Sequence, residues 1–211
     1  MPRPSSEPVS VSEADSRRRF TRAELEAFRD ATLPDLVGPQ TRLLFVGINP
    51  GLWTAAVQAH FSRRGNRFYP ALHRAGITER LIDASNGYTS GDREYLLQRG
   101  IGITNLVHRA TARADELTPA ELAEGGRALA ARVAGLGPDV VAVLGISAYR
   151  LAFAQPHAKA GLQPEPLGPS QLWVVPNPSG LNAHSTLASL AAAYREVALA
   201  AGLTFDPPAS G

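Results

Sequence analysis

Four short apolar runs along the chain predict buried β-strands. They are Arg42–Ile48, Gly102–Val107, Asp139–Leu144 and Leu172–Val175. Runs of this length that do not alternate with polar residues are typical of parallel strands, which are covered on both faces. A parallel strand needs a long crossover to reach its neighbour, so the pattern also predicts helices between the runs.

Segments with helical periodicity or helix-ending residues lie between and around these runs. The predicted helices are Thr21–Ala31, Asn66–Ala75, Arg93–Arg99, Pro119–Leu136, Ser147–Phe153 and Thr186–Ala200. The helix Pro119–Leu136 has the clearest ends, because Thr118 can cap it and Gly137 follows its last residue. Strands that alternate with helices predict an α/β fold with a parallel sheet covered on both faces.

A single domain, residues 20–205, contains all of these elements. Residues 1–19 are polar and rich in Pro and Ser, which predicts a disordered tail, and residues 206–211 read as a short second tail. The stretches 81–90 and 155–171 are expected to be surface excursions. No apolar stretch approaches the roughly 18–20 residues of a membrane span, and the N-terminus lacks the apolar region of a signal peptide. We therefore expect a cytoplasmic protein, and a monomer by default.

Composition narrows the chemistry. Lys and Arg together number 21 against 19 for Asp and Glu, so net charge alone does not indicate a polyanion ligand. Nearly all of the basic residues are arginine, which suits bidentate phosphate contacts, and Arg63, Arg64 and Arg67 lie close together. The chain has no cysteine, which removes thiol nucleophiles, disulfides and Cys-based metal sites, and its five histidines show no metal-ligand spacing. We expect no metal and no cofactor.

Two look-alike segments follow the first and last apolar runs. They are Gly47-Ile48-Asn49-Pro50-Gly51 and Asn177-Pro178-Ser179-Gly180-Leu181. Ligands of open α/β sheets bind at the carboxyl ends of the strands, so both segments should face one cleft. Asn49 can orient a water there but cannot accept its proton, and it can alternatively serve only to shape the turn.

Three further residues each allow a functional and a structural interpretation. Phe61 can stack on a base or pack in the core. His60 can donate to a base edge or lie exposed at the surface. Leu181 is an apolar residue in a polar loop, and it can either wedge between base steps of a duplex or fold back on its own loop.

Several ordered motifs together carry a family resemblance. They are Gly47–Leu52, Gly65-Asn66-Arg67-Phe68, Gly102–Val107, Glu124-Gly125-Gly126-Arg127 and Asn177–Leu181. The region from about Arg42 to Ala200 resembles the mismatch-specific uracil/thymine-DNA glycosylases, in the uracil-DNA glycosylase superfamily. The resemblance implies a three-layer α/β/α domain that flips uracil, preferentially opposite guanine, out of double-stranded DNA and leaves an abasic site during base excision repair.

The resemblance also assigns roles to residues. It implies that Asn49 positions the attacking water and that Phe61 stacks on the flipped base, with backbone groups near Ile48 and Phe61 holding the polar edge of the pyrimidine. The expected base pocket comprises Ile48, Thr54, His60, Phe61 and Asn105. The expected DNA-binding and wedge residues are Ser179, Gly180, Leu181, Asn182, His184, Arg63 and Arg64, with Ser179 and the following helix N-terminus on phosphate.

Some positions depart from the family pattern or leave alternatives open. Thr54 could crowd the methyl group of thymine, which favours uracil, and Ala183 replaces an Arg found after the wedge in some relatives. Asp92 could supply the general base that Asn49 cannot be, or act only as a turn or N-cap residue. Two other functions remain open on sequence alone: a mismatch- or abasic-site-binding module that does not cleave, and a hydrolase of small nucleotides.

Overall fold

A central sheet organises the fold. The computed structural model describes residues 19–183 and 185–204. In this part of the chain five strands form one sheet in the order β2-β1-β3-β5-β4. The strands are β1 (Leu43–Gly47), β2 (Ile101–Asn105), β3 (Val140–Leu144), β4 (Gly161–Leu162) and β5 (Gln171–Val175). The first four in the sheet order are parallel to one another, and the two-residue β4 is antiparallel to β5.

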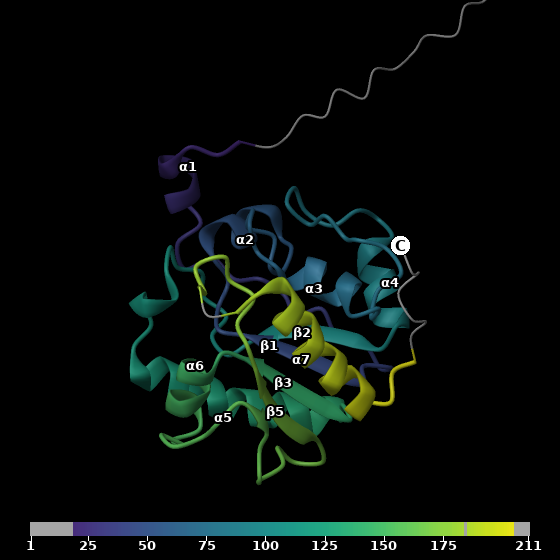
Figure 1. The fold of residues 1–211 in the computed structure, drawn as a ribbon. Coiled ribbons are helices and arrows are strands. Elements are labelled where there is room, and N and C mark those ends of the chain that lie inside the picture. The colour runs from purple at the N-terminus through teal and green to yellow at the C-terminus, as the bar shows by residue number, and fades with distance from the viewer. Residues whose placement is uncertain (1–18, 184, 205–211) are drawn as a thin grey trace, which may run out of the picture.

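Helices cover both faces of this sheet (Figure 1). They are α1 (Arg22–Glu26), α2 (Leu52–Val57), α3 (Phe68–Arg74), α4 (Asp92–Gln98), α5 (Pro119–Leu136), α6 (Ile146–Ala152) and α7 (Leu187–Ala200), with a 3-10 turn at Ala114–Glu116. Helices α3, α4 and α7 pack on one face and α5 and α6 on the other, while α1 packs beside α2. None of these helices is both long and apolar enough to cross a membrane.

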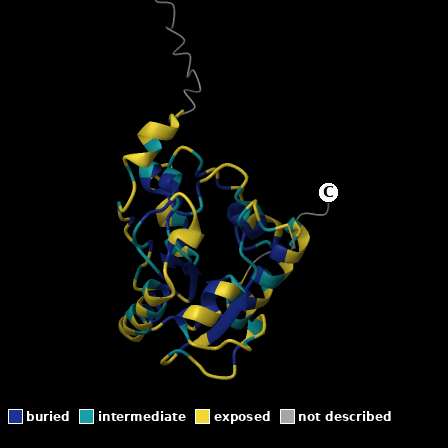
Figure 2. Cartoon of the chain, turned by 90° about the vertical axis from the view of Figure 1, so that its left-hand side faces the viewer, coloured by how far each residue is buried: buried dark blue, intermediate teal, exposed yellow. Residues whose placement is uncertain are grey.

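The core explains why the strand runs are continuously apolar. In β1, Leu43 and Phe45 contact the α3–α7 layer, and the alternate residues Leu44 and Val46 contact the α5–α6 layer. All five residues of β1 are buried. Figure 2 shows the strands as a buried band between helices whose outer faces are exposed. The expected α/β fold with a mainly parallel, doubly covered sheet is confirmed.

Some boundaries differ from the sequence prediction. Helix α1 ends at Glu26 rather than at Ala31, and Asp30 adopts a left-handed backbone with φ of 62°. Neither α2 nor β4 was predicted, because each is too short to show a period. The stretch 81–90 is less superficial than expected, since Ile82 and Ala84 are buried in the core.

Candidate functional site

The carboxyl ends of the four parallel strands meet at one cleft of about 320 Å³. Asn105 ends β2, the segment Gly47–Gly51 begins at the last residue of β1, Leu144 ends β3, and Asn177 follows β5. The structure therefore brings the two look-alike segments to one cleft, as the sequence predicts. Every strand that contributes is parallel to its neighbours, which is why residues far apart in sequence converge at this edge.

The amide of Asn49 is held in one orientation. Its Nδ2 donates to the Arg109 carbonyl at 3.1 Å and to Thr111 Oγ1 at 2.7 Å. Thr111 donates its only hydroxyl hydrogen to the Arg113 carbonyl at 2.7 Å, so it can only accept from Asn49. Both amide hydrogens are thus used, while Oδ1 accepts no hydrogen bond from a described residue. That oxygen is available to a water.

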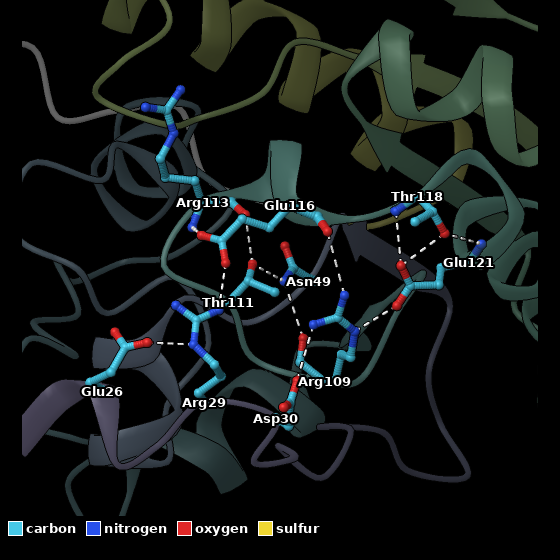
Figure 3. A network of polar contacts seen from close by, with 10 residues as sticks. All are labelled: Glu26, Arg29, Asp30, Asn49, Arg109, Thr111, Arg113, Glu116, Thr118 and Glu121. Carbon is cyan, nitrogen blue, oxygen red and sulfur yellow. Dashed lines mark hydrogen bonds and ion pairs between the residues drawn. The ribbon is translucent and has the colours of Figure 1, made fainter.

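Arg109 fixes the loop that holds Asn49 (Figure 3). Its guanidinium pairs with Asp30 at 3.0 Å and also with Glu121. The hydrogen bond from Arg109 is the main reason that the pKa of Glu121 falls to about 2. Glu116 in the same network pairs with Arg29, just after α1. Sequence reasoning missed Arg109 and Thr111, because a polar residue after a strand carries no sign of its distant partner.

Gly47, the last residue of β1, has no side chain and so leaves space in the cleft beside the Phe61 ring. A Cβ on Gly47 would lie 2.4 Å from Asn105 Oδ1 and 3.3 Å from Phe61 Cζ. Phe61 has φ of 54°, unusual for a non-glycine residue, and its ring stacks on Phe68 with centroids 4.1 Å apart. Phe61 packs against the core and also lines the cleft, so its core role is confirmed and stacking on a base stays a prediction.

Several polar groups of the cleft have no internal partner. Asn105 is buried at 4% exposure, and its side-chain amide forms no hydrogen bond within the described residues. The N–H groups of Ile48 and Phe61 likewise donate to no described residue. Buried polar groups are usually paired, so such a set indicates a polar ligand. Thr54, also buried in the wall, is the exception, because its Oγ1 accepts from Ser62 at 3.3 Å.

His60 lines the cleft but is buried rather than exposed. Its Nε2 lies 3.1 Å from the Pro34 carbonyl, which can only accept, so Nε2 carries the hydrogen and Nδ1 is an acceptor. Burial lowers the pKa of His60 to about 4. The ring is therefore neutral at physiological pH, and its Nε2 donor is already used by the protein.

The loop after β5 presents an exposed leucine. Leu181 is 80% exposed and lines the cleft together with Ser179. Asn177 Oδ1 accepts from the Ser179 N–H at 2.9 Å, and Asn182 Nδ2 donates to the Asn177 carbonyl at 3.0 Å. These bonds close the loop on itself and leave Leu181 directed away from the core, so the leucine does not fold back.

Arg67 supports this loop instead of facing solvent with the neighbouring arginines. Its Nη2 donates to the carbonyls of Ser179 at 2.7 Å and Asn182 at 2.9 Å, and its Nη1 donates to Ser185. Arg63 is exposed at the cleft, and Arg64 is exposed on the adjoining surface. The predicted basic cluster therefore divides into one residue that holds the loop and two that remain at the surface.

Three predicted DNA contacts remain: Gly180, the N-terminus of the helix after the loop, and His184. Gly180 packs against Gly65, where a Cβ would meet the Gly65 carbonyl oxygen at 2.8 Å. Helix α7 begins at Leu187, and Thr186 already caps its first turn. His184 lies outside the described residues.

The structure does not bring Asp92 to the cleft. Asp92 is the first residue of α4, is buried, and accepts from the Thr89 N–H at 2.7 Å. Arg80 pairs with it at 2.7 Å. Burial alone would raise the pKa of Asp92, but the bonds from Thr89 and Arg80 outweigh burial and hold this pKa below its usual range. The turn and helix-start interpretation fits these contacts.

No cluster of metal-binding side chains accompanies these residues in the described part of the chain. Within residues 19–183 and 185–204, no three His, Asp or Glu side chains come together as a metal site would require. The sequence model of the uracil DNA glycosylase superfamily matches residues 34–199, which is most of the chain.

Proposed function

The chain belongs to the uracil-DNA glycosylase superfamily, whose members are DNA glycosylases, and we propose that it excises uracil from DNA, preferentially opposite guanine. The target nucleotide must leave the stack, because its glycosidic bond is unreachable inside a duplex. The observation that carries the proposal is the fixed amide of Asn49, with Oδ1 free in a cleft that also has unpaired donors. The mismatch-specific uracil/thymine branch is the proposed branch of the superfamily.

Asn49 would orient the attacking water. Its Oδ1 accepts a hydrogen bond from the water and directs the water oxygen to C1′ of the sugar. The bond from C1′ to the base N1 breaks, its electron pair leaves with the base, and the released water proton passes to solvent. Because an amide cannot take that proton, bond breaking must precede full attack, and stabilisation of the departing base becomes the larger contribution.

The base would lie beside Phe61 at the side-chain-free end of β1. The N–H groups of Ile48 and Phe61 donate to its carbonyl oxygens, and the Asn105 amide faces its polar edge. These groups can stabilise negative charge on the departing uracil without a rearrangement of the protein. Leu181 would occupy the space that the flipped nucleotide leaves in the stack.

Single-turnover excision on end-labelled oligonucleotides tests the proposal. The substrates carry U:G, U:A, T:G or single-stranded uracil, and alkali reveals abasic sites. We expect cleavage of U:G that falls about 100- to 1,000-fold in Asn49→Ala and is unchanged in Asn86→Ala, an exposed asparagine outside the cleft. If the protein binds the duplex but cleaves none of these substrates, the result would instead support a DNA-binding module that does not cleave.

A further inference from the structure

A second groove adjoins the cleft beside α1. It has a volume of about 1,000 Å³ and shares Gly51, Arg63, Ala112 and Arg113 with the cleft, so the two are continuous. Helix α1 lines it opposite the first residues of α2. Residues 22–26 precede the superfamily match, which begins at residue 34. The groove is therefore built partly by a helix outside the matched region.

Positive charge in this groove exceeds the negative charge that residues 19–183 and 185–204 place against it. Arg29 pairs with Glu26 and Glu116, the two acidic residues of the lining, and Arg113 pairs with Asp115. Three other arginines of the lining form no side-chain hydrogen bond or ion pair with any described residue. These are Arg22, Arg63 and Arg64. Exposed guanidinium groups without partners beside a nucleic-acid cleft indicate a phosphate ligand.

The floor of the groove is apolar. It includes Leu25, Leu52 and Trp53. The Trp53 indole N–H donates to the Ser85 carbonyl at 2.8 Å. The rings of Trp53 and Phe20 pack edge to face with centroids 5.1 Å apart, so the indole is held in place. A duplex backbone needs no apolar surface, whereas unpaired bases do, and proteins that bind single strands combine such surface with basic residues. The volume lies at the upper end of the roughly 300–1,000 Å³ of small-ligand sites, which leaves room for a nucleotide.

We propose that this groove binds unpaired nucleotides of the substrate strand next to the flipped uracil. The inference rests on the proposed glycosylase function. Bases lie over the apolar floor, and their phosphates lie near Arg22, Arg63 and Arg64. The protein then accepts uracil in single-stranded DNA or near strand ends, where neighbouring nucleotides are free to enter the groove.

Two variants on the outer wall test this inference without touching the cleft. Arg22→Ala removes one unpartnered charge, and Ala23→Glu adds a repulsive one at an exposed position. Arg74→Ala, an exposed arginine on α3 that lines neither groove nor cleft, is the charge-matched control. Binding is measured by fluorescence anisotropy in the Asn49→Ala background, with a single-stranded uracil oligonucleotide and a blunt U:G duplex.

We expect Arg22→Ala to weaken single-strand binding about three- to tenfold and to reduce the salt slope by about one. Ala23→Glu weakens it further, and Arg74→Ala leaves it unchanged. Binding of the duplex and the melting temperatures of all variants change little. With Asn49 restored, the single-turnover rate constant at saturating enzyme is also unchanged, because the groove does not touch the reacting atoms.

Tryptophan emission gives a second, independent measurement. The chain has two tryptophans, and Trp173 is buried in β5. In a Trp173→Phe background, the single-stranded oligonucleotide should quench Trp53 emission, and Arg22→Ala should shift that titration to higher concentration. The blunt duplex should leave the emission unchanged.

Equal weakening of single-strand and duplex binding by Arg22→Ala would assign the groove to the duplex backbone and overturn the inference. Unchanged single-strand binding in both variants would overturn it as well. A protein that excises uracil from U:G but ignores single-stranded uracil would refute the inference and leave the proposed function standing. No excision on any substrate would remove the proposed function, and the inference with it.

Discussion

At the scale of single residues, the Thr111 hydroxyl is one of two groups that orient the Asn49 amide. Thr111 has one hydrogen and gives it to the Arg113 carbonyl, so its lone pair receives the Asn49 amide. A side chain of the same shape without the hydroxyl would leave the amide held only by the Arg109 carbonyl, and so less firmly oriented. In the proposed mechanism the attacking water would then have a less firmly held acceptor, while the fold stays intact.

Thr111→Val should therefore slow uracil excision about 10- to 100-fold at saturating enzyme, because misplacement of a reacting group by about 1 Å has effects of this size. Thr111→Ser keeps the hydroxyl and should restore most of the rate. Substrate affinity should change little in either variant. An unchanged rate in Thr111→Val would show that the hydroxyl does not position Asn49.

For Asp92 we predict an effect on stability rather than on catalysis, because its partners are Thr89, just before α4, and Arg80. Asp92→Asn should lower the free energy of unfolding by about 1–2 kcal/mol, because a hydrogen-bonded buried charge is lost. Glu94→Gln, at an exposed position of the same helix, should have almost no effect. Urea unfolding measures both. Slower excision with unchanged stability in Asp92→Asn would restore the general-base hypothesis.

The sequence could locate Asn49 but not its orientation. A buried run followed by Asn-Pro-Gly marks the end of a strand, which is a local pattern. The partners that hold the amide lie 60 and 62 residues further along the chain, and spacing does not reveal them. The same limit applies to His60, whose tautomer depends on the carbonyl of Pro34.

At the scale of elements, two loops act as one unit. The Arg67 N–H donates to the Pro178 carbonyl at 3.0 Å, and its guanidinium holds the carbonyls of the loop that carries Leu181. The planar fork of arginine can serve several carbonyls at once, which an ammonium group cannot do in the same geometry. The position of Leu181 therefore depends on Arg67.

Arg67→Lys should weaken binding of a U:G duplex roughly tenfold, and Leu181→Ala should do the same. If Arg67 acts through the wedge, the double variant should cost little more than either single one, since coupled residues are not additive. Binding is measured with the Asn49→Ala protein. Effects that simply add would indicate that Arg67 contacts DNA directly or acts elsewhere.

The strands were predictable because burial on both faces makes them continuously apolar. Long helices with clear caps, such as α5, were predictable for a similar local reason. Of the short elements, α2 and β4 were not predicted, whereas the seven-residue helices α3, α4 and α6 were. Helix α2 has six residues, and β4 has two, so tertiary contacts rather than local pattern determine them.

At the scale of the whole molecule, the N-terminal segment is tied to the site. Arg29 and Asp30 follow α1 and pair with Glu116 and Arg109, which belong to the segment around Thr111. The sequence predicted a helix here but could not show what the segment packs against. If the segment after α1 detaches, the loop that carries Arg109 and Thr111 should therefore become more mobile.

Acid should unfold the protein partly through one histidine. Burial lowers the pKa of His60 to about 4 in the folded state, so the unfolded state binds more protons between about pH 6.5 and 4. Stability should fall by about 2–3 kcal/mol as pH drops through this range, and level off for this group below it.

Urea unfolding at several pH values checks this, with His60→Gln as the comparison. The variant should lose most of the slope between pH 6.5 and 4. Both proteins should keep a further loss as pH falls from about 4.5 toward 2, where Glu121 with its lowered pKa becomes protonated. Identical slopes above pH 4.5 would show that His60 is not the responsible group.

The convergence of four parallel strands on one cleft makes enzymatic activity a reporter of tertiary assembly. No single loop or helix supplies the residues that we propose position the water, bind the base and enter the duplex. Separation of β1 from β2, of β1 from β3, or of β3 from β5 would move some of these residues away from the others. Activity during denaturation should therefore disappear in the same transition as the sheet, with no partially folded species able to process DNA, and recovery of excision after refolding would time the closing of the last strand pair.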